Sequence, residues 1–287
     1  MLHRARPAIA ALTAVCALAA CVVALPLAPE DEARLAALLP ADVLLLGEQH
    51  DAPAHQRLQR QAVEWLAARG ELAALALEMA ERGHDTRALP RDASAAQVQQ
   101  ALAWQGAGWP WATYGPVVMA AVRAGVPVLG ANLPSARQRD AMRDATLEAR
   151  LPPQALAEQQ RRIREGHCHL LPEAQIQPMT RVQIARDIAM AETVSTARQP
   201  GRTVLLVAGN GHVQRALGVP AHLPPDVKSR VISAQSGPAQ APADPAAARS
   251  RPESASDADL LWPTPAVPAR DYCAEFRRMA PALKPGQ

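Results

Sequence analysis

Two histidines of this chain stand at the same short distance after a glycine, each at the end of an apolar run. Residues 43–50 read VLLLGEQH and residues 204–212 read VLLVAGNGH, so His50 and His212 each follow a glycine by three positions. A carboxylate, Glu48, lies beside the first histidine. Imidazole and carboxylate groups in one pocket can divide general acid and base roles, or they can hold a divalent metal ion. The alternative is a satisfied polar network that bridges strand ends without doing chemistry.

Polar side chains follow four of the expected strands. They are Glu48 with His50, Glu78, Asn132, and Asn210 with His212. Because parallel strands bring their carboxyl ends to one edge of a sheet, we expect these groups to line a single crevice. The candidate catalytic groups in it are Glu48, His50, Glu78 and His212.

The elements that must position these groups are short apolar runs that alternate with longer helical patterns. Runs of four to six residues that end at glycine or a polar residue indicate buried strands. The expected strands cover residues 43–47, 72–77, 126–130, 204–208, 231–234 and 259–262. This alternation predicts an α/β fold with a mostly parallel central sheet flanked by helices.

Helical patterns fill the intervals between the strands. The expected helices are 29–37, 51–70, two within 92–123 on either side of a Gly/Trp-rich turn, one beginning near 136, one beginning at 152–153, and 173–197. Asp51 and Ser135 have the residue types of N-caps. The last and longest helix should lay one apolar face on the sheet, formed by Ile176, Met179, Val182, Ala185 and Ala189.

Half of the eight aromatic residues fall within eleven positions, as Trp104, Trp109, Trp111 and Tyr114. A core patch is the plain explanation, but a flat apolar ligand would need such a surface. Tyr114 could also supply a phenolate to ferric haem, as in catalase. Covalent haem attachment is excluded because the chain has no C-x-x-C-H motif.

The first twenty residues read as a signal peptide, with a positive start and an apolar stretch. The sequence Leu-Ala-Ala-Cys at residues 18–21 resembles a bacterial lipobox, which predicts acylation of Cys21, with residues 21–40 forming a lipidated N-terminus and lead-in helix. Ordinary cleavage or an uncleaved anchor are the alternatives. Because Val22 rather than an aspartate follows, we expect a periplasmic lipoprotein held at the outer membrane. Without the signal the chain is close to neutral, which favours no nucleic acid partner.

Two cysteines, Cys168 and Cys273, remain after the signal and lipobox are set aside. In an oxidising compartment they can form a disulfide, or they can stay as free buried thiols. Residues 236–257 are dense in Pro, Ala and Ser and predict a mobile insertion. We therefore expect one domain over residues 41–277, followed by a tail at 278–287.

Several of these segments match one family in order. The runs LLLGEQHDAPAH, ALAWQGAGWPWATYGPVV, GHCHLLPE, LLVAGNGHVQRALGVP and DYC resemble ChaN-type haem-binding lipoproteins. That family belongs to a superfamily with the Tiki and TraB proteins and, more distantly, erythromycin-esterase-like enzymes. The resemblance implies an outer-membrane lipoprotein of haem and iron uptake that binds non-covalent haem and pairs as a homodimer around it.

The same resemblance implies two different sites. For haem, the candidate contacts are Tyr114, His50, His212, Asn210, Trp111 and Arg137, with Tyr272 the other available phenol. From the Tiki side, the resemblance implies a metal-dependent peptidase or esterase with a metal at His50, Glu78 and His212 and with Glu48 as a further acid. Haem binding is favoured here, and hydrolysis is the alternative.

Overall fold

The computed structural model describes residues 26–237 and 257–279. In this part of the chain, six strands form one sheet in the order β3-β2-β4-β1-β5-β6, and all neighbouring strands run parallel. The strands are β1 Val43–Glu48, β2 Leu72–Glu81, β3 Val128–Asn132, β4 Thr203–Gly209, β5 Ser229–Ser236 and β6 Leu260–Thr264. The predicted α/β fold is confirmed.

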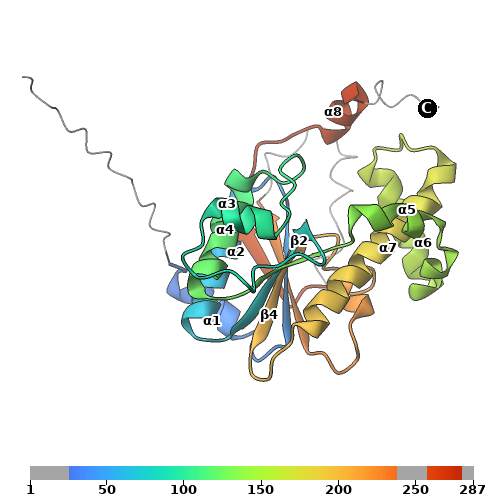
Figure 1. Cartoon of the computed structure of the whole chain (residues 1–287). Coiled ribbons are helices and arrows are strands. Elements are labelled where there is room, and N and C mark those ends of the chain that lie inside the picture. The colour runs from blue at the N-terminus through green and yellow to red at the C-terminus, as the bar shows by residue number, and fades with distance from the viewer. Residues whose placement is uncertain (1–25, 238–256, 280–287) are drawn as a thin grey trace, which may run out of the picture.

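The helices from α1 to α7 lie where the sequence places them, and two 3₁₀ turns and α8 were not predicted. The helical elements are α1 Pro29–Ala36, α2 Pro53–Ala68, α3 Ala95–Ala101, α4 Trp111–Ala124, α5 Ser135–Arg143, the 3₁₀ turn η1 Ala145–Arg150, α6 Pro153–Gly166, α7 Glu173–Thr196, the 3₁₀ turn η2 Val219–His222 and α8 Tyr272–Met279. One side of the sheet carries α2 and α4, and α7 crosses the other (Figure 1).

The central strands are buried along their whole length because both faces of the sheet are covered. In β1 the pleat sends Leu44 and Leu46 into the core that α2 and α4 share, and Val43 and Leu45 into the core beneath α7. An unbroken apolar run is therefore what such a strand requires.

Strand β2 is longer than its apolar run predicts. It continues past Leu77 to Glu81, and after a shift in register Glu81 pairs with Asn132 of β3. Glu78 therefore lies inside the strand rather than after it. Its position within the strand holds its carboxylate at the end of the sheet where the strands have their carboxyl ends.

The expectation that α7 lays its whole apolar face on the sheet is wrong for its first half. Val182 and Ala185 pack with Ala141 of α5, while the residues that reach the sheet core belong to the second half: Met190, Ala191 and Val194. We call α5, η1, α6 and the first half of α7 the helical arm. The helical arm lies beside the sheet, so the first half of α7 packs against other helices instead of on the sheet (Figure 1).

Both predicted N-caps are also wrong. Helix α2 begins at Pro53 with Ala52 as its cap, and Asp51 instead accepts hydrogen bonds from Gln49 and Tyr272. Ser135 is the first residue of α5, after Pro134. In each case a proline or its neighbour sets the backbone for helix entry, so no side-chain cap is needed.

The predicted disulfide is present and joins Cys168, in the turn between α6 and α7, to Cys273 of α8. The signal peptide and Cys21 lie outside the described residues, as do residues 238–256 of the predicted mobile insertion and residues 280–287 of the tail. Strand β5 extends through Ser236, where that insertion was expected to begin. Among the described residues, no helix has the length and apolar character that a membrane crossing needs.

Candidate functional site

The carboxyl ends of β1 and β4 are direct neighbours in the sheet. Glu48 pairs with Gly209 in the parallel register, and the amide of Asn210 donates to the carbonyl of Glu48 at 2.8 Å. A Cβ added at Gly209 would lie 2.9 Å from Nε2 of His50, so only glycine leaves room for that ring. The structure therefore places His50 and His212 at one rim, as the strand pattern predicts.

The carboxylate of Glu48 is buried and accepts four hydrogen bonds. The donors are His50 Nδ1 and the hydroxyl of Tyr114, both at 2.7 Å, and the side-chain amides of Gln56 at 2.6 Å and Gln59 at 2.5 Å. A buried carboxylate with four hydrogen bonds fixes the orientation of its donors, and the donors in turn fix the orientation of the carboxylate. Glu48 therefore acts as the hub that orients His50.

The bond to Glu48 also sets the tautomer of His50. Because the ionised carboxylate only accepts, Nδ1 carries the proton and Nε2 carries the lone pair in the neutral ring. Nε2 points inward and lies 4.0 Å from the Glu78 carboxylate. Burial lowers the pKa of His50, but Glu48 and Glu78 outweigh it, so the net shift is upward.

Glu78 lies at the centre of the site and is fully buried. One oxygen accepts from the amide of Gly209 at 2.7 Å, and the other from the guanidinium of Arg186 at 2.6 Å and from His212, whose Nε2 is 3.3 Å away. Burial would raise the pKa of Glu78, but the charges of His212 and Arg186 outweigh it and lower that pKa. Glu78 therefore stays ionised in the folded protein.

His212 forms a second carboxylate–imidazole pair. Its Nδ1 lies 2.5 Å from Asp187 of α7, and Gln183 of the same helix is within 3.0 Å of that nitrogen. Burial lowers the pKa of His212, but Glu78 and Asp187 together raise it to about 9. His212 is therefore an imidazolium at neutral pH.

The site as a whole consists of two imidazoles, each oriented by its own carboxylate, whose Nε2 atoms face Glu78. Such a set can hold and move protons between neighbouring groups. Asp187 and Arg186 were not among the predicted site residues, although a charged pair in an otherwise apolar helical turn is a visible signal. Gln56 and Gln59, which are polar residues on the buried face of α2, were not predicted either.

The predicted divalent metal at His50, Glu78 and His212 is not supported. These side chains do converge, but the Glu78 oxygens already accept from Arg186 and a backbone amide, and His212 Nδ1 is taken by Asp187. A guanidinium at 2.6 Å from the central carboxylate opposes a second cation. Within residues 26–237 and 257–279, no group of three or more His, Cys, Asp and Glu has the arrangement of a metal site.

Of the aromatic cluster, Tyr114 belongs to the core, and the half-buried rings of Trp104, Trp109 and Trp111 pack against that core. Tyr114 is buried, and burial together with Glu48 raises the pKa of its phenol. Trp104 packs edge-on against Trp111, and its ring nitrogen donates to the carbonyl of Trp109 at 2.8 Å. Trp109 packs edge-on against His50, with ring centres 4.8 Å apart. The cluster thus walls the site on one side.

Three predicted polar residues take different positions. Asn132 joins the site, because its side chain accepts from Arg186 at 2.9 Å. Asn210 turns away toward β5 and bonds to Ser233 and to the carbonyl of residue 234. Arg137 is exposed on α5 and pairs with the aspartate one turn later. Neither Asn210 nor Arg137 faces the buried groups.

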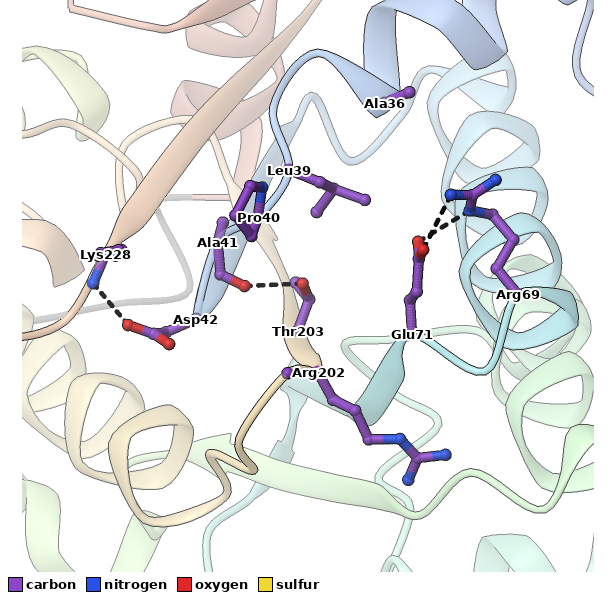
Figure 2. Close-up of a pocket in the computed structure, with 11 residues that line it drawn as sticks. Ala36, Leu39, Pro40, Ala41, Asp42, Arg69, Glu71, Arg202, Thr203 and Lys228 are labelled. Atoms are coloured by element: carbon purple, nitrogen blue, oxygen red, sulfur yellow. Dashed lines mark hydrogen bonds and ion pairs between the residues drawn. The ribbon is translucent and has the colours of Figure 1, made fainter.

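Two cavities matter for placing a ligand. One of about 480 Å³ opens beside His50 between α2 and α4, and Asp51, Arg57 and Arg60 line it. The other, of about 420 Å³, opens at the amino ends of the strands (Figure 2). In that second cavity Arg69 and Glu71 pair with each other. The cavity lies at the opposite end of the strands from Glu48, which is the last residue of β1.

The family model described as "Haem-binding uptake, Tiki superfamily, ChaN" matches residues 34–223, which is well over half of the chain. The chain belongs to the ChaN haem-binding uptake family. A structure described as "Cofacial heme binding to ChaN of Campylobacter jejuni" shares the fold at 24% identity, with a TM-score of 0.60 over 74% of this chain and 88% of that one.

Two further structures match at lower similarity. A Bacillus cereus protein is 16% identical with a TM-score of 0.39, covering 72% of this chain and 69% of its own. An effector domain of a Vibrio vulnificus MARTX toxin is 15% identical with a TM-score of 0.36, covering 70% and 35%. No match was found among curated proteins.

Proposed function

We propose that this protein binds haem beside the His50 cavity, through the phenol of Tyr272, and serves haem uptake in the cell envelope. Membership of the ChaN family supports haem as the ligand. The observation that carries the site is that Tyr272 is the exposed one of the two candidate phenols, with 48% of the residue accessible, whereas Tyr114 is buried. Tyr272 donates to Asp51, which lines the cavity.

The other candidate ligands are enclosed. Tyr114 and His212 are buried and bound to carboxylates. The ring of His50 is 41% exposed, but Nδ1 donates to Glu48 and Nε2 points inward to Glu78, 4.0 Å away. With both nitrogens directed at buried carboxylates, His50 offers haem its ring face rather than a ligand atom.

The cavity also holds groups suited to the haem carboxylates. Arg57 is exposed and has no hydrogen-bond or ion-pair partner among the described residues, and Arg60 one turn later pairs with Glu64. Arginine binds carboxylates through two parallel hydrogen bonds. Pro53 and Pro116 add apolar surface to the same wall. These features fit an amphipathic tetrapyrrole.

Hemin titration of the chain without its first 21 residues tests this proposal. A saturable Soret shift is expected, and Tyr272→Phe should weaken the affinity at least about tenfold, since removing an axial ligand costs more than about 1.4 kcal/mol. Tyr114→Phe is the matched control and should bind as the wild type does. Equal affinities for Tyr272→Phe and the wild type would overturn the assignment.

A second candidate function is acid–base hydrolysis of a peptide or ester, and the buried network favours it. Haem contact at the surface gives no role to Glu78, His212 and Asp187, yet these groups are held in fixed orientations. With His212 as the proton donor and His50 as the base, they could activate water without a metal. Glu78→Gln should then abolish turnover of ester or peptide substrates, while Tyr272→Phe should not.

The envelope location rests on the lipobox and remains a proposal. Acylation of Cys21 would tether the mature chain to a membrane, and mass spectrometry of the purified lipoprotein would detect the added chains. Cys21→Ser should release the protein into the soluble periplasm. Dimer formation around haem is likewise a prediction, which light scattering with and without hemin would test.

A further inference from the structure

Helix α8 lies above the sheet (Figure 1), and its first two residues are attached to two different parts of the body. Tyr272 donates to Asp51 in the loop between β1 and α2, and Cys273 forms the disulfide with Cys168 of the helical arm. Figure 1 shows α8 above the sheet, with the arm on one side and α3 and α4 on the other. The disulfide therefore fixes the residue next to Tyr272 to the helical arm.

The turn that carries Cys168 is under backbone strain. Cys168 and His169 both have φ of 56°, in the left-handed region that residues other than glycine seldom enter, and here two do so in succession. Beside it, the ring of His167 packs edge-on against Phe276 of α8 at 6.2 Å. Contacts from α8 thus help to hold a conformation that the turn would otherwise leave.

Few other features tie α8 to the body. The segment from Pro265 to Asp271 that leads into it is mostly exposed and contains two prolines. Both cysteines are half-buried rather than enclosed, and thiol–disulfide exchange needs access to only one of the two sulfur atoms. Loss of the disulfide would leave the Tyr272–Asp51 bond and the His167–Phe276 contact to hold the helix.

We propose that the Cys168–Cys273 disulfide is a reversible redox site that controls haem affinity. A dithiol attacks one sulfur, forms a mixed disulfide and then closes to its own disulfide, so that its two electrons and two protons leave both cysteines as thiols. The freed α8 then leaves its position above the sheet for much of the time and takes Tyr272 away from Asp51. The effect on haem rests on the proposed function above.

Two measurements on the chain from residue 21, with Cys21→Ser so that two cysteines remain, test this inference. The first follows proteolysis or hydrogen exchange of residues 265–279 with and without a dithiol, in the absence of haem. Reduction should expose this segment while the sheet stays protected. If neither cysteine becomes titratable in the folded protein, or the segment is unchanged, the inference is wrong.

The second measurement is hemin affinity, with Cys168→Ser/Cys273→Ser as a permanently reduced form that needs no added thiol. Its dissociation constant should rise at least about tenfold, because Tyr272 is presented only a fraction of the time. Tyr272→Phe should make oxidised and reduced forms equal. An unchanged affinity in the double variant overturns the redox control, whereas a failure of the oxidised wild type to bind hemin overturns the haem site instead.

Discussion

Replacing Asp187 by asparagine tests how the buried charges of the site contribute to stability. The pKa of His212 is about 9 in the folded protein against the ordinary 6.5. A folded-state pKa above the unfolded one stabilises fully below about pH 6.5, and the contribution disappears as the pH rises to about 9. The difference corresponds to about 3 kcal/mol of unfolding free energy.

Asp187→Asn keeps the size of the side chain but removes one of the two carboxylates that raise this pKa. Glu78 remains, so the loss is partial. The decline in unfolding free energy between pH 6 and 9.5 should therefore shrink by at least about 1 kcal/mol. Urea unfolding at half-unit pH steps measures it, and NMR titration of the His212 ring gives the pKa directly.

The matched control is Asp226→Asn, which removes an exposed carboxylate paired with Arg198 at 3.0 Å. Its pH profile above 6 should run parallel to that of the wild type, since surface pairs contribute little. His50 is present in every variant, so its own titration cancels in the comparison. A wild-type His212 that titrates near 6.5, or an Asp187→Asn profile parallel to the wild type, would refute the reasoning.

Two further substitutions follow from the packing. Tyr114→Phe removes one of four donors to the buried Glu48 carboxylate, so thermal or urea unfolding should show a loss of about 1.5–3 kcal/mol. An unchanged midpoint would contradict the hub role of Glu48. Gly130→Ala places a Cβ on the carbonyl oxygen of Glu81 at the register shift between β2 and β3, and should destabilise by about 3 kcal/mol in urea. Gly106→Ala, in open space, is its control and should change stability by less than about 1 kcal/mol.

The strands and the strand-end residues were predictable because their signals are local. A parallel strand covered on both faces needs an unbroken apolar run, and Val43–Leu46 and Val204–Ala208 supply one. Glycine at the end of each run leaves room for a close backbone approach. Glu48, His50, Glu78 and His212 could therefore be assigned to one edge without coordinates.

The helical contributions to the site were not predictable in the same way. Asp187 and Arg186 are visible as a charged pair in α7, but their partners lie on β2 and beyond β4. Gln56 and Gln59 point from α2 to a carboxylate on β1. Each role depends on where a helix crosses the sheet, and helical periodicity gives only the face that is buried.

The aromatic cluster is a second example of a role that the sequence does not determine. Four aromatic residues in eleven positions suggested a ligand surface, but their number does not say whether their rings contact a ligand or pack against other side chains. The structure buries Tyr114 on Glu48 and leaves Tyr272 exposed and bonded to Asp51. The sequence contained both phenols, and only burial separates them.

By itself, the sequence determined the parallel α/β fold, the edge at which the histidines meet and the two cysteines that can pair, because these follow from short-range patterns and from elimination. Tertiary structure alone decided which carboxylate each imidazole binds, that Arg186 rather than a metal ion neutralises Glu78, and that α8 is attached both to the helical arm and to Asp51. These outcomes depend on contacts between segments far apart in the chain. Distances of a few ångströms between such segments are set by the packing of whole helices, which no local pattern records.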